Sequence, residues 1–133
     1  MSQKQFLTLA AFIACTIGAI ALFSPVFLLV DMKAATASGA AVTMARTAGA
    51  FLLSIGLLNF MVRADKASPT MASILLANAL LQMFILPIDP IAYLTGVYGD
   101  AMSFIPNTIL HIALLYGFIH FWKKTNAEIG ARR

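Results

Sequence analysis

Four long apolar runs, separated by short polar segments, dominate the hydropathy pattern of the chain. These runs cover residues 6–24, 39–62, 69–86 and 104–122. Each is close to the 20 or so residues that a helix needs to cross the hydrocarbon core of a bilayer. Ser24-Pro25 ends the first run, because proline interrupts helical hydrogen bonding. The pattern therefore predicts four membrane-spanning helices.

The composition agrees with this pattern. Of the 133 residues, 61% are hydrophobic and only 11% are charged, whereas a soluble domain has about 25% charged residues. Little chain is left for a soluble domain, and the net charge of +4 gives no sign of nucleic-acid binding. We expect an all-α polytopic membrane protein, an antiparallel bundle of four transmembrane helices forming one transmembrane domain over residues 1–133, with the lipid bilayer as its surroundings.

The basic residues lie on one side of this arrangement. Four spans place both termini and the 63–67 turn on the same side of the membrane. That side holds Lys4, Arg63, Lys66, Lys123, Lys124, Arg132 and Arg133, and the opposite side holds only Lys33 and Arg46. Because basic loops stay in the cytoplasm, we expect cytoplasmic termini in an integral, multi-pass protein, most simply one of a bacterial inner membrane.

Small residues recur at four-residue spacing in the first two spans. The stripes are Ala10, Ala14 and Gly18 in the first span, and Ala41, Ala45 and Gly49 in the second. Such stripes allow helices in a membrane to approach closely. If the two helices are antiparallel, Gly18 and Gly49 lie at about the same depth, and we predict a close crossing there. A homodimer seam through one of these stripes is the alternative.

The last two spans carry polar side chains in their interiors. Asn78 and Gln82 lie one turn apart on one face of the third span, and Asn107 and His111 do so on the fourth. A hairpin whose turn centres at residues 94–95 places Asn78 level with His111, and Gln82 level with Asn107. Because polar groups avoid hydrocarbon, we expect these four residues to point inward and at one another, forming a candidate ligand site.

Arg46 is the unusual charge of the second span. It could extend its side chain to the membrane interface, or it could pair with Asp89, Asp31 or Asp100. Depth favours Asp89, so we predict an Arg46–Asp89 ion pair at the mouth of the candidate ligand site.

His111 leaves three interpretations open. It can be a neutral histidine held by a hydrogen bond to a neighbouring asparagine, part of a polar pocket, or an axial ligand to a haem or a chlorophyll-type pigment. No specific motif implies a cofactor, and no metal site is expected, because Cys15 is the single cysteine.

Catalytic motifs give no support for an enzyme. The chain has no phosphate-binding loop, dinucleotide fingerprint, zinc-protease motif or serine-hydrolase elbow. The small size and missing soluble domain favour a non-catalytic accessory or structural subunit of a larger membrane complex, with other membrane subunits or further copies as partners. The alternative is a small ligand-handling bundle that binds a lipid, quinone, pigment or haem at the midplane polar site.

The segment from Arg46 to Arg63 reads RTAGAFLLSIGLLNFMVR. Its pattern, R-x2-G-x3-L-x2-G-L-L with a closing arginine, resembles the second helix of small bacterial four-helix membrane proteins of unassigned function, including DoxX-type proteins. The resemblance covers under a fifth of the chain and implies a four-helix bundle. It implies no reaction, because the association of DoxX proteins with quinone-linked redox complexes carries over no specific residue.

Overall fold

The structure is a computed structural model that describes residues 1–132, so Arg133 of the basic tail lies outside the described residues. Every regular element in residues 1–132 is helical. The elements are α1 (Gln3–Phe23), α2 (Pro25–Phe27), the π-helical segment η1 (Leu28–Met32), α3 (Gly39–Val62), α4 (Pro69–Ile85), α5 (Ile88–Leu94), the 3-10 turn η2 (Ala101–Ser103) and α6 (Ile105–Gly130). The predicted all-α bundle is confirmed.

Four helical stretches are long and apolar enough to cross a membrane. They are Gln3–Phe23, Gly39–Val62, Pro69–Leu94 and Ala101–Gly130. Large apolar side chains such as Phe12, Phe51 and Tyr116 lie exposed on their outer faces. Such surfaces suit hydrocarbon rather than water, so the chain is an integral, multi-pass membrane protein.

Serine residues begin three of the long helices. Ser2 and Gln5 form a reciprocal capping box, in which the Ser2 hydroxyl accepts from the Gln5 N–H at 3.2 Å. Ser38 accepts from the N–H of Ala41, and Ser68 accepts from the N–H of Met71. Each cap supplies a partner for a backbone donor that the first helical turn leaves unpaired.

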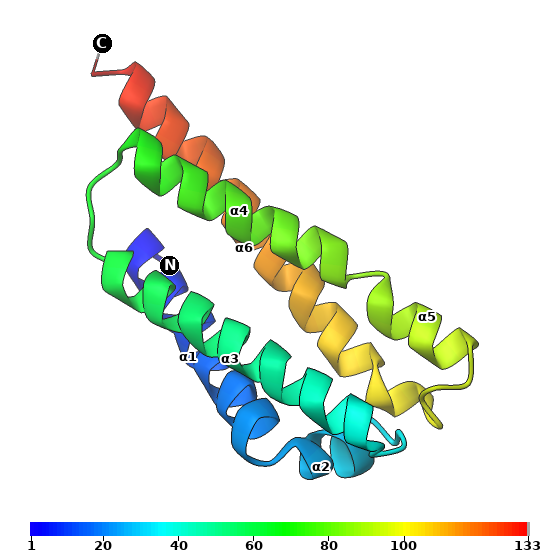
Figure 1. The fold of residues 1–133 in the computed structure, drawn as a ribbon. Helices are drawn as coiled ribbons and strands as arrows, with labels where there is room; N and C mark the ends of the chain where they lie inside the picture. Colours follow the sequence, from blue (N-terminus) through cyan, green and yellow to red (C-terminus); the bar gives the residue numbers. More distant parts are fainter. Residues whose placement is uncertain (133) are drawn as a thin grey trace.

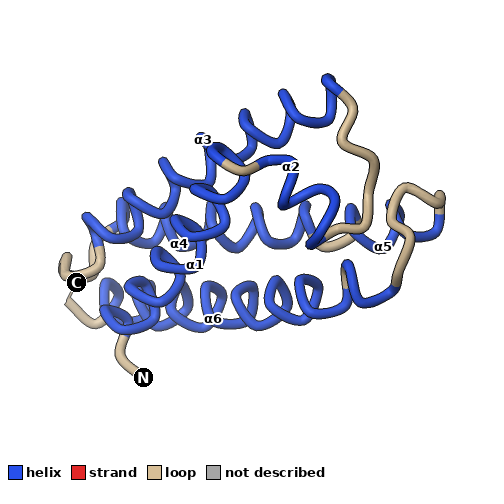
Figure 2. The backbone as a smooth tube through the Cα atoms, turned by 90° about the horizontal axis from the view of Figure 1, so that it is seen from below, coloured by secondary structure: helices blue, strands red, loops and turns tan. Residues whose placement is uncertain are grey.

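The helices associate as two hairpins. α1 packs mainly against α3, and α4 packs mainly against α6, whereas contacts between the hairpins are far fewer (Figures 1 and 2). Both chain ends and the 63–68 connection lie at one end of the molecule, which we call the termini end. Segments 28–38 and 95–104 lie at the other, which we call the loop end.

The first hairpin closes over two facing glycines. A Cβ atom added at Gly49 would lie 2.7 Å from the carbonyl oxygen of Gly18 and 2.6 Å from the backbone nitrogen of Leu22. An added Cβ at Gly18 would lie 2.9 Å from the carbonyl oxygen of Gly49. The structure thus brings the two predicted residues together within one chain, with backbone against backbone.

The hairpins meet in an apolar core toward the termini end. The Phe6 ring of α1 lies between Phe118 and Phe121 of α6, with ring centroids 4.8 and 5.1 Å away. Met71 and Leu75 of α4 complete this core, and both are almost fully buried. The apolar packing therefore joins the hairpins toward the termini end.

Three features of the helices differ from the sequence-based expectation. α1 begins at Gln3 rather than at residue 6, because Ser2 caps the polar residues that precede the apolar run. α6 continues to Gly130 rather than ending near Trp122, because the chain remains helical beyond its apolar portion. α5 (Ile88–Leu94) occupies part of the connection that the sequence analysis treats as a simple turn centred at residues 94–95. Pro87 and Pro90 lie at its first turn, where proline is compatible with a helix.

Candidate functional site

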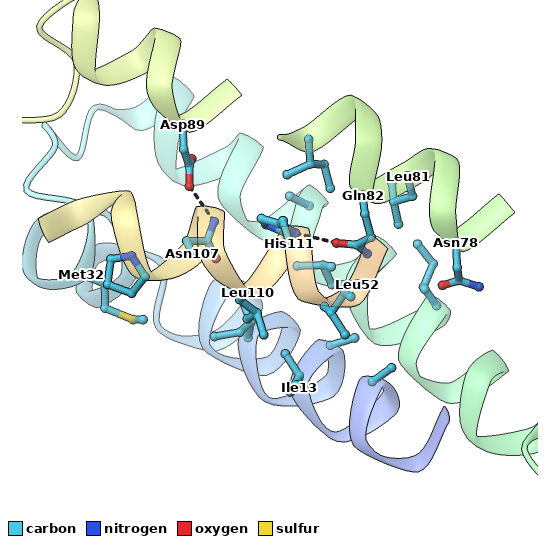
Figure 3. Close-up of a pocket in the computed structure, with 18 of the residues that line it drawn as sticks. Ile13, Met32, Leu52, Asn78, Leu81, Gln82, Asp89, Asn107, Leu110 and His111 are labelled. Carbon is cyan, nitrogen blue, oxygen red and sulfur yellow. Dashed lines mark hydrogen bonds between the residues drawn. The ribbon is translucent and has the colours of Figure 1, made fainter. Parts of the chain in front are cut away.

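A cavity of about 590 Å³ lies between the two hairpins (Figure 3). Its walls are mostly apolar and come from all four long helices, for example Ile13 of α1, Leu52 of α3, Leu81 of α4 and Leu110 of α6. Its volume lies within the range of about 300–1,000 Å³ that is usual for small-molecule sites. The polar side chains that line it are those of Lys33, Asn59, Asn78, Gln82, Asp89, Ser103, Asn107 and His111.

Asp89 is the centre of a polar cluster at the loop end of the cavity. Its Oδ2 accepts from Lys33 Nζ at 2.7 Å and from Asn107 Nδ2 at 2.6 Å, and its Oδ1 accepts from the Tyr98 hydroxyl at 3.0 Å. Figure 3 shows the contact between Asp89 on α5 and Asn107 on α6. A buried carboxylate requires such donors, because an unpaired charge in an apolar setting is very unfavourable.

Tyr98 remains a hydrogen-bond donor in this cluster. Burial, and next the negative charge of Asp89, raise the pKa of the Tyr98 phenol above its ordinary value. The phenol therefore keeps its proton at neutral pH, and its O–H donates a hydrogen bond to the carboxylate. The Lys33 ammonium also lies 5.2 Å from the centre of the Tyr98 ring, a distance that suits a cation–π contact.

The same region links the two hairpins through the backbone. The Gly99 N–H donates to the carbonyl oxygen of Ala34 at 3.2 Å. Ala34 has a left-handed backbone conformation, with φ at 48°, which an L-residue adopts at some energetic cost. This turn follows η1 directly and places Lys33 at the mouth of the cavity, opposite Asp89.

Gln82 and His111 form a second polar contact, deeper in the cavity. His111 Nδ1 lies 2.5 Å from Gln82 Oε1, and the two side chains come from facing positions on α4 and α6 (Figure 3). Gln82 is buried and His111 is half-buried. Leu81 and Leu110 line the cavity next to this pair (Figure 3).

Asn59 and Asn78 form the third polar contact, toward the termini end. Each side-chain amide donates to the oxygen of the other at 3.0 Å. The Asn78 amide also donates to the carbonyl oxygen of Ile74 at 2.9 Å. Both residues are almost completely buried, and their reciprocal bonds connect α3 of one hairpin to α4 of the other.

The predicted ion pair between Arg46 and Asp89 is wrong. Asp89 forms its salt bridge with Lys33, while Arg46 is exposed on α3 and does not line the cavity. The reason is geometric. Arg46 lies two residues from the cavity-lining Ala48, and this separation points the two side chains to opposite sides of a helix.

The predicted polar layers lie in the cavity, but their pairing is shifted. Asn78 pairs with Asn59 rather than His111, and Gln82 pairs with His111 rather than Asn107. The prediction rests on a simple turn centred at residues 94–95. α5 and η2 make the connection asymmetric, which moves α6 by about one turn relative to α4.

Three residues of the site are not predicted by the sequence pattern. That pattern places Asn59 at the inner end of its span, and it places Lys33 and Tyr98 in connecting segments. The signal in the sequence that could have identified them is that each is a polar or amphipathic residue close to an apolar run. Only the folding of segments 28–34 and 95–100 onto the bundle brings Lys33 and Tyr98 to Asp89.

The described residues contain no group of three or more histidine, cysteine, aspartate or glutamate side chains placed to hold a metal ion. The site is thus a mainly apolar cavity with an ion pair at its mouth and neutral polar pairs along its length. Comparisons with known protein families, with curated proteins and with solved structures find no match for this chain.

Proposed function

We propose that this protein binds one small amphiphilic molecule in the cavity between its hairpins. The observation that carries the proposal is the cavity itself, an apolar space within a membrane bundle that contains a few convergent polar groups. This combination is typical of ligand sites, where apolar walls provide most of the contact and polar groups fix the orientation.

The polar groups are distributed in a way that suits an amphiphile. The charged Lys33–Asp89 pair and Asn107 lie at the loop end. Toward the termini end, the Asn59 and Asn78 amides are paired with each other, and the remaining wall there is formed by apolar side chains such as Phe118. A molecule with one polar part and one apolar part satisfies both regions. The opposite charges of Lys33 and Asp89 cancel locally, which favours an uncharged polar part over an ionic one.

The proposed orientation places this polar end on the outer side of the membrane. Lys4, Lys66 and Lys123 are among the basic residues at the termini end, and basic segments are retained in the cytoplasm. The ligand is then drawn from the bilayer or from the outer surface. A quinone, a lipid, a pigment and a haem are the candidate classes that a midplane polar site suggests.

Mass spectrometry of the intact protein, released from native membranes in mild detergent, tests the proposal. We expect an added small-molecule mass at one per chain. Ala48→Phe should remove this mass, because Ala48 lines the cavity and a phenyl ring would occupy it. Ala50→Phe is the matched control, since Ala50 is exposed on α3 and does not line the cavity.

Two results would contradict the proposal. One is a protein released without any bound molecule. The other is an Ala48→Phe variant that still carries the bound molecule. Release as part of a large assembly of other membrane proteins would support instead the accessory-subunit function. An absorption spectrum of the same sample identifies a haem or a pigment directly.

A further inference from the structure

The polar groups of the cavity differ in how many of their hydrogen-bonding positions are already used. Asp89 accepts three hydrogen bonds and carries a charge that Lys33 balances. Asn59 and Asn78 bind each other reciprocally, and both Asn78 amide protons are used. The capacity that remains around Asp89 belongs to Lys33 and Asn107, which lie at the mouth of the cavity and each make one side-chain hydrogen bond, to Asp89.

Deeper in the cavity, the Gln82–His111 pair also keeps unused hydrogen-bonding positions. Only one atom of each side chain takes part in their contact, Oε1 of Gln82 and Nδ1 of His111. Within residues 1–132, neither the Gln82 Nε2 nor the His111 Nε2 has a hydrogen-bond partner. Both residues line the cavity (Figure 3). The pair therefore offers two unused polar atoms to whatever occupies the space.

The chemistry of these two atoms follows from the contact that the pair already makes. Gln82 Oε1 is an acceptor, so His111 Nδ1 carries the proton that lies between them. In a neutral imidazole, Nε2 is then an acceptor, while the Gln82 NH2 group is a donor. The Gln82 and His111 side chains thus present one donor and one acceptor to the cavity.

The count of one donor and one acceptor is the same for both orientations of the Gln82 amide. Turning the Gln82 amide over makes its nitrogen the donor to His111 Nδ1, so that His111 Nε2 carries the proton. Gln82 then presents its oxygen to the cavity and His111 presents an N–H. One donor and one acceptor remain, with their positions exchanged.

We infer that the ligand of this cavity carries an uncharged hydroxyl group that bridges Gln82 and His111. This inference rests on the proposed function. A hydroxyl both donates and accepts, so it satisfies both atoms at once. A ketone, an ether and an ionised carboxylate only accept, and each would leave the acceptor of the pair without a partner in an apolar setting. The ligand class is therefore a long-chain alcohol, a sterol-like alcohol or a phenol.

The test compares two probes that differ only in this group, dodecanol and dodecyl methyl ether. Binding is measured to the full chain in phosphatidylcholine nanodiscs. We expect the ether to bind at least about tenfold more weakly than the alcohol, because one buried polar atom loses its partner. With isotope-labelled histidine, dodecanol should shift the ring-nitrogen NMR signals of His111, whereas the ether should leave the acceptor signal unchanged.

Variants show whether this pair is responsible for the preference. In Gln82→Leu/His111→Leu both partners are removed together, a change that leaves no unpaired polar group and so preserves folding. This double variant should bind the alcohol and the ether with affinities within about twofold of each other, as expected when no polar contact separates them. Ser54→Ala, on the exposed face of α3, should keep the preference of the unchanged protein.

The outcomes separate the two proposals. If both probes bind the unchanged protein equally, and Ala48→Phe prevents their binding, the cavity is a ligand site and the hydroxyl inference is overturned. If the double variant keeps the alcohol preference, another group recognises the hydroxyl and the inference fails as well. If neither probe binds and no native molecule accompanies the chain, the proposed function itself is refuted.

Discussion

At the scale of single residues, the carboxylate of Asp89 depends on three donors that come from three separate segments of the chain. Lys33 lies directly after η1, Tyr98 lies in the loop after α5, and Asn107 lies near the start of α6. Only Lys33 brings a compensating charge. The loop end of the molecule therefore relies on one lysine to neutralise a buried acid.

Replacing this lysine should destabilise the protein. In Lys33→Met, Asp89 keeps its two neutral donors and loses its counter-charge, so we expect a loss of about 3 kcal/mol, near the lower end of the range for breaking a buried ion pair. The measurement is the free energy of unfolding in mixed micelles. Lys66→Met is the control, because Lys66 is exposed in the connection at the other end.

A change below about 0.5 kcal/mol in Lys33→Met, no larger than that of an ordinary surface substitution, would show that the two neutral donors suffice. The double variant Lys33→Met/Asp89→Leu should recover much of the lost stability, because it removes the unpaired charge itself.

At the scale of helices, the two hairpins are held together in different ways. α1 and α3 approach backbone to backbone at Gly18 and Gly49. α4 and α6 are joined by larger side chains, such as Leu114 and Phe118, and by the Gln82–His111 contact. The first hairpin is therefore sensitive to the addition of a single methyl group at its crossing point.

Gly49→Ala tests this sensitivity. The new Cβ would lie within 2.7 Å of the Gly18 carbonyl oxygen, so the backbones of α1 and α3 must move apart. We expect a loss of about 1–3 kcal/mol in unfolding free energy, the usual cost of adding volume to a closely packed site. Gly39→Ala is the matched control, since an added Cβ there would meet no atom within 4 Å. Equal stability of the two variants would contradict the close crossing.

The sequence predicts the helices better than the contacts between them. The lengths of the apolar runs and the serine and proline residues at their ends are local signals. They locate α3 and α4 to within a residue. The partner of Asp89 is not a local property. It depends on how segment 28–34 folds back over the bundle, whereas the predicted pairing of Arg46 with Asp89 rests on depth alone. The one-turn shift between α4 and α6 likewise arises in α5 and η2, whose helical form the loop-like sequence does not indicate. The resemblance of α3 to DoxX-type proteins stays a prediction.

At the scale of the whole molecule, the aromatic core and the mouth of the cavity lie at opposite ends. The termini end holds the aromatic core around Phe6 and Phe118. The loop end holds the cavity mouth with Lys33 and Asp89. If the charge distribution sets the orientation as proposed, the cavity mouth faces away from the cytoplasm.

Labelling of single cysteines tests this orientation. With Cys15 replaced by serine, Thr36→Cys places an exposed thiol at the loop end, and Ala127→Cys places one at the termini end. We expect a membrane-impermeant maleimide to label Thr36→Cys in intact cells and to label Ala127→Cys only after lysis, because basic loops are retained inside. The reverse pattern would overturn the proposed topology.

The separation of the chain into two hairpins also bears on the order of events during synthesis. α1 and α3 complete their mutual packing with residues that leave the ribosome before α4 does, and each hairpin relies on contacts made mostly within itself. The salt bridge of Lys33, however, requires Asp89, which is synthesised 56 residues later. A newly made chain therefore carries a lysine without its counter-charge until Asp89 is made, so the Lys33–Asp89 salt bridge cannot form before the second hairpin has begun to emerge.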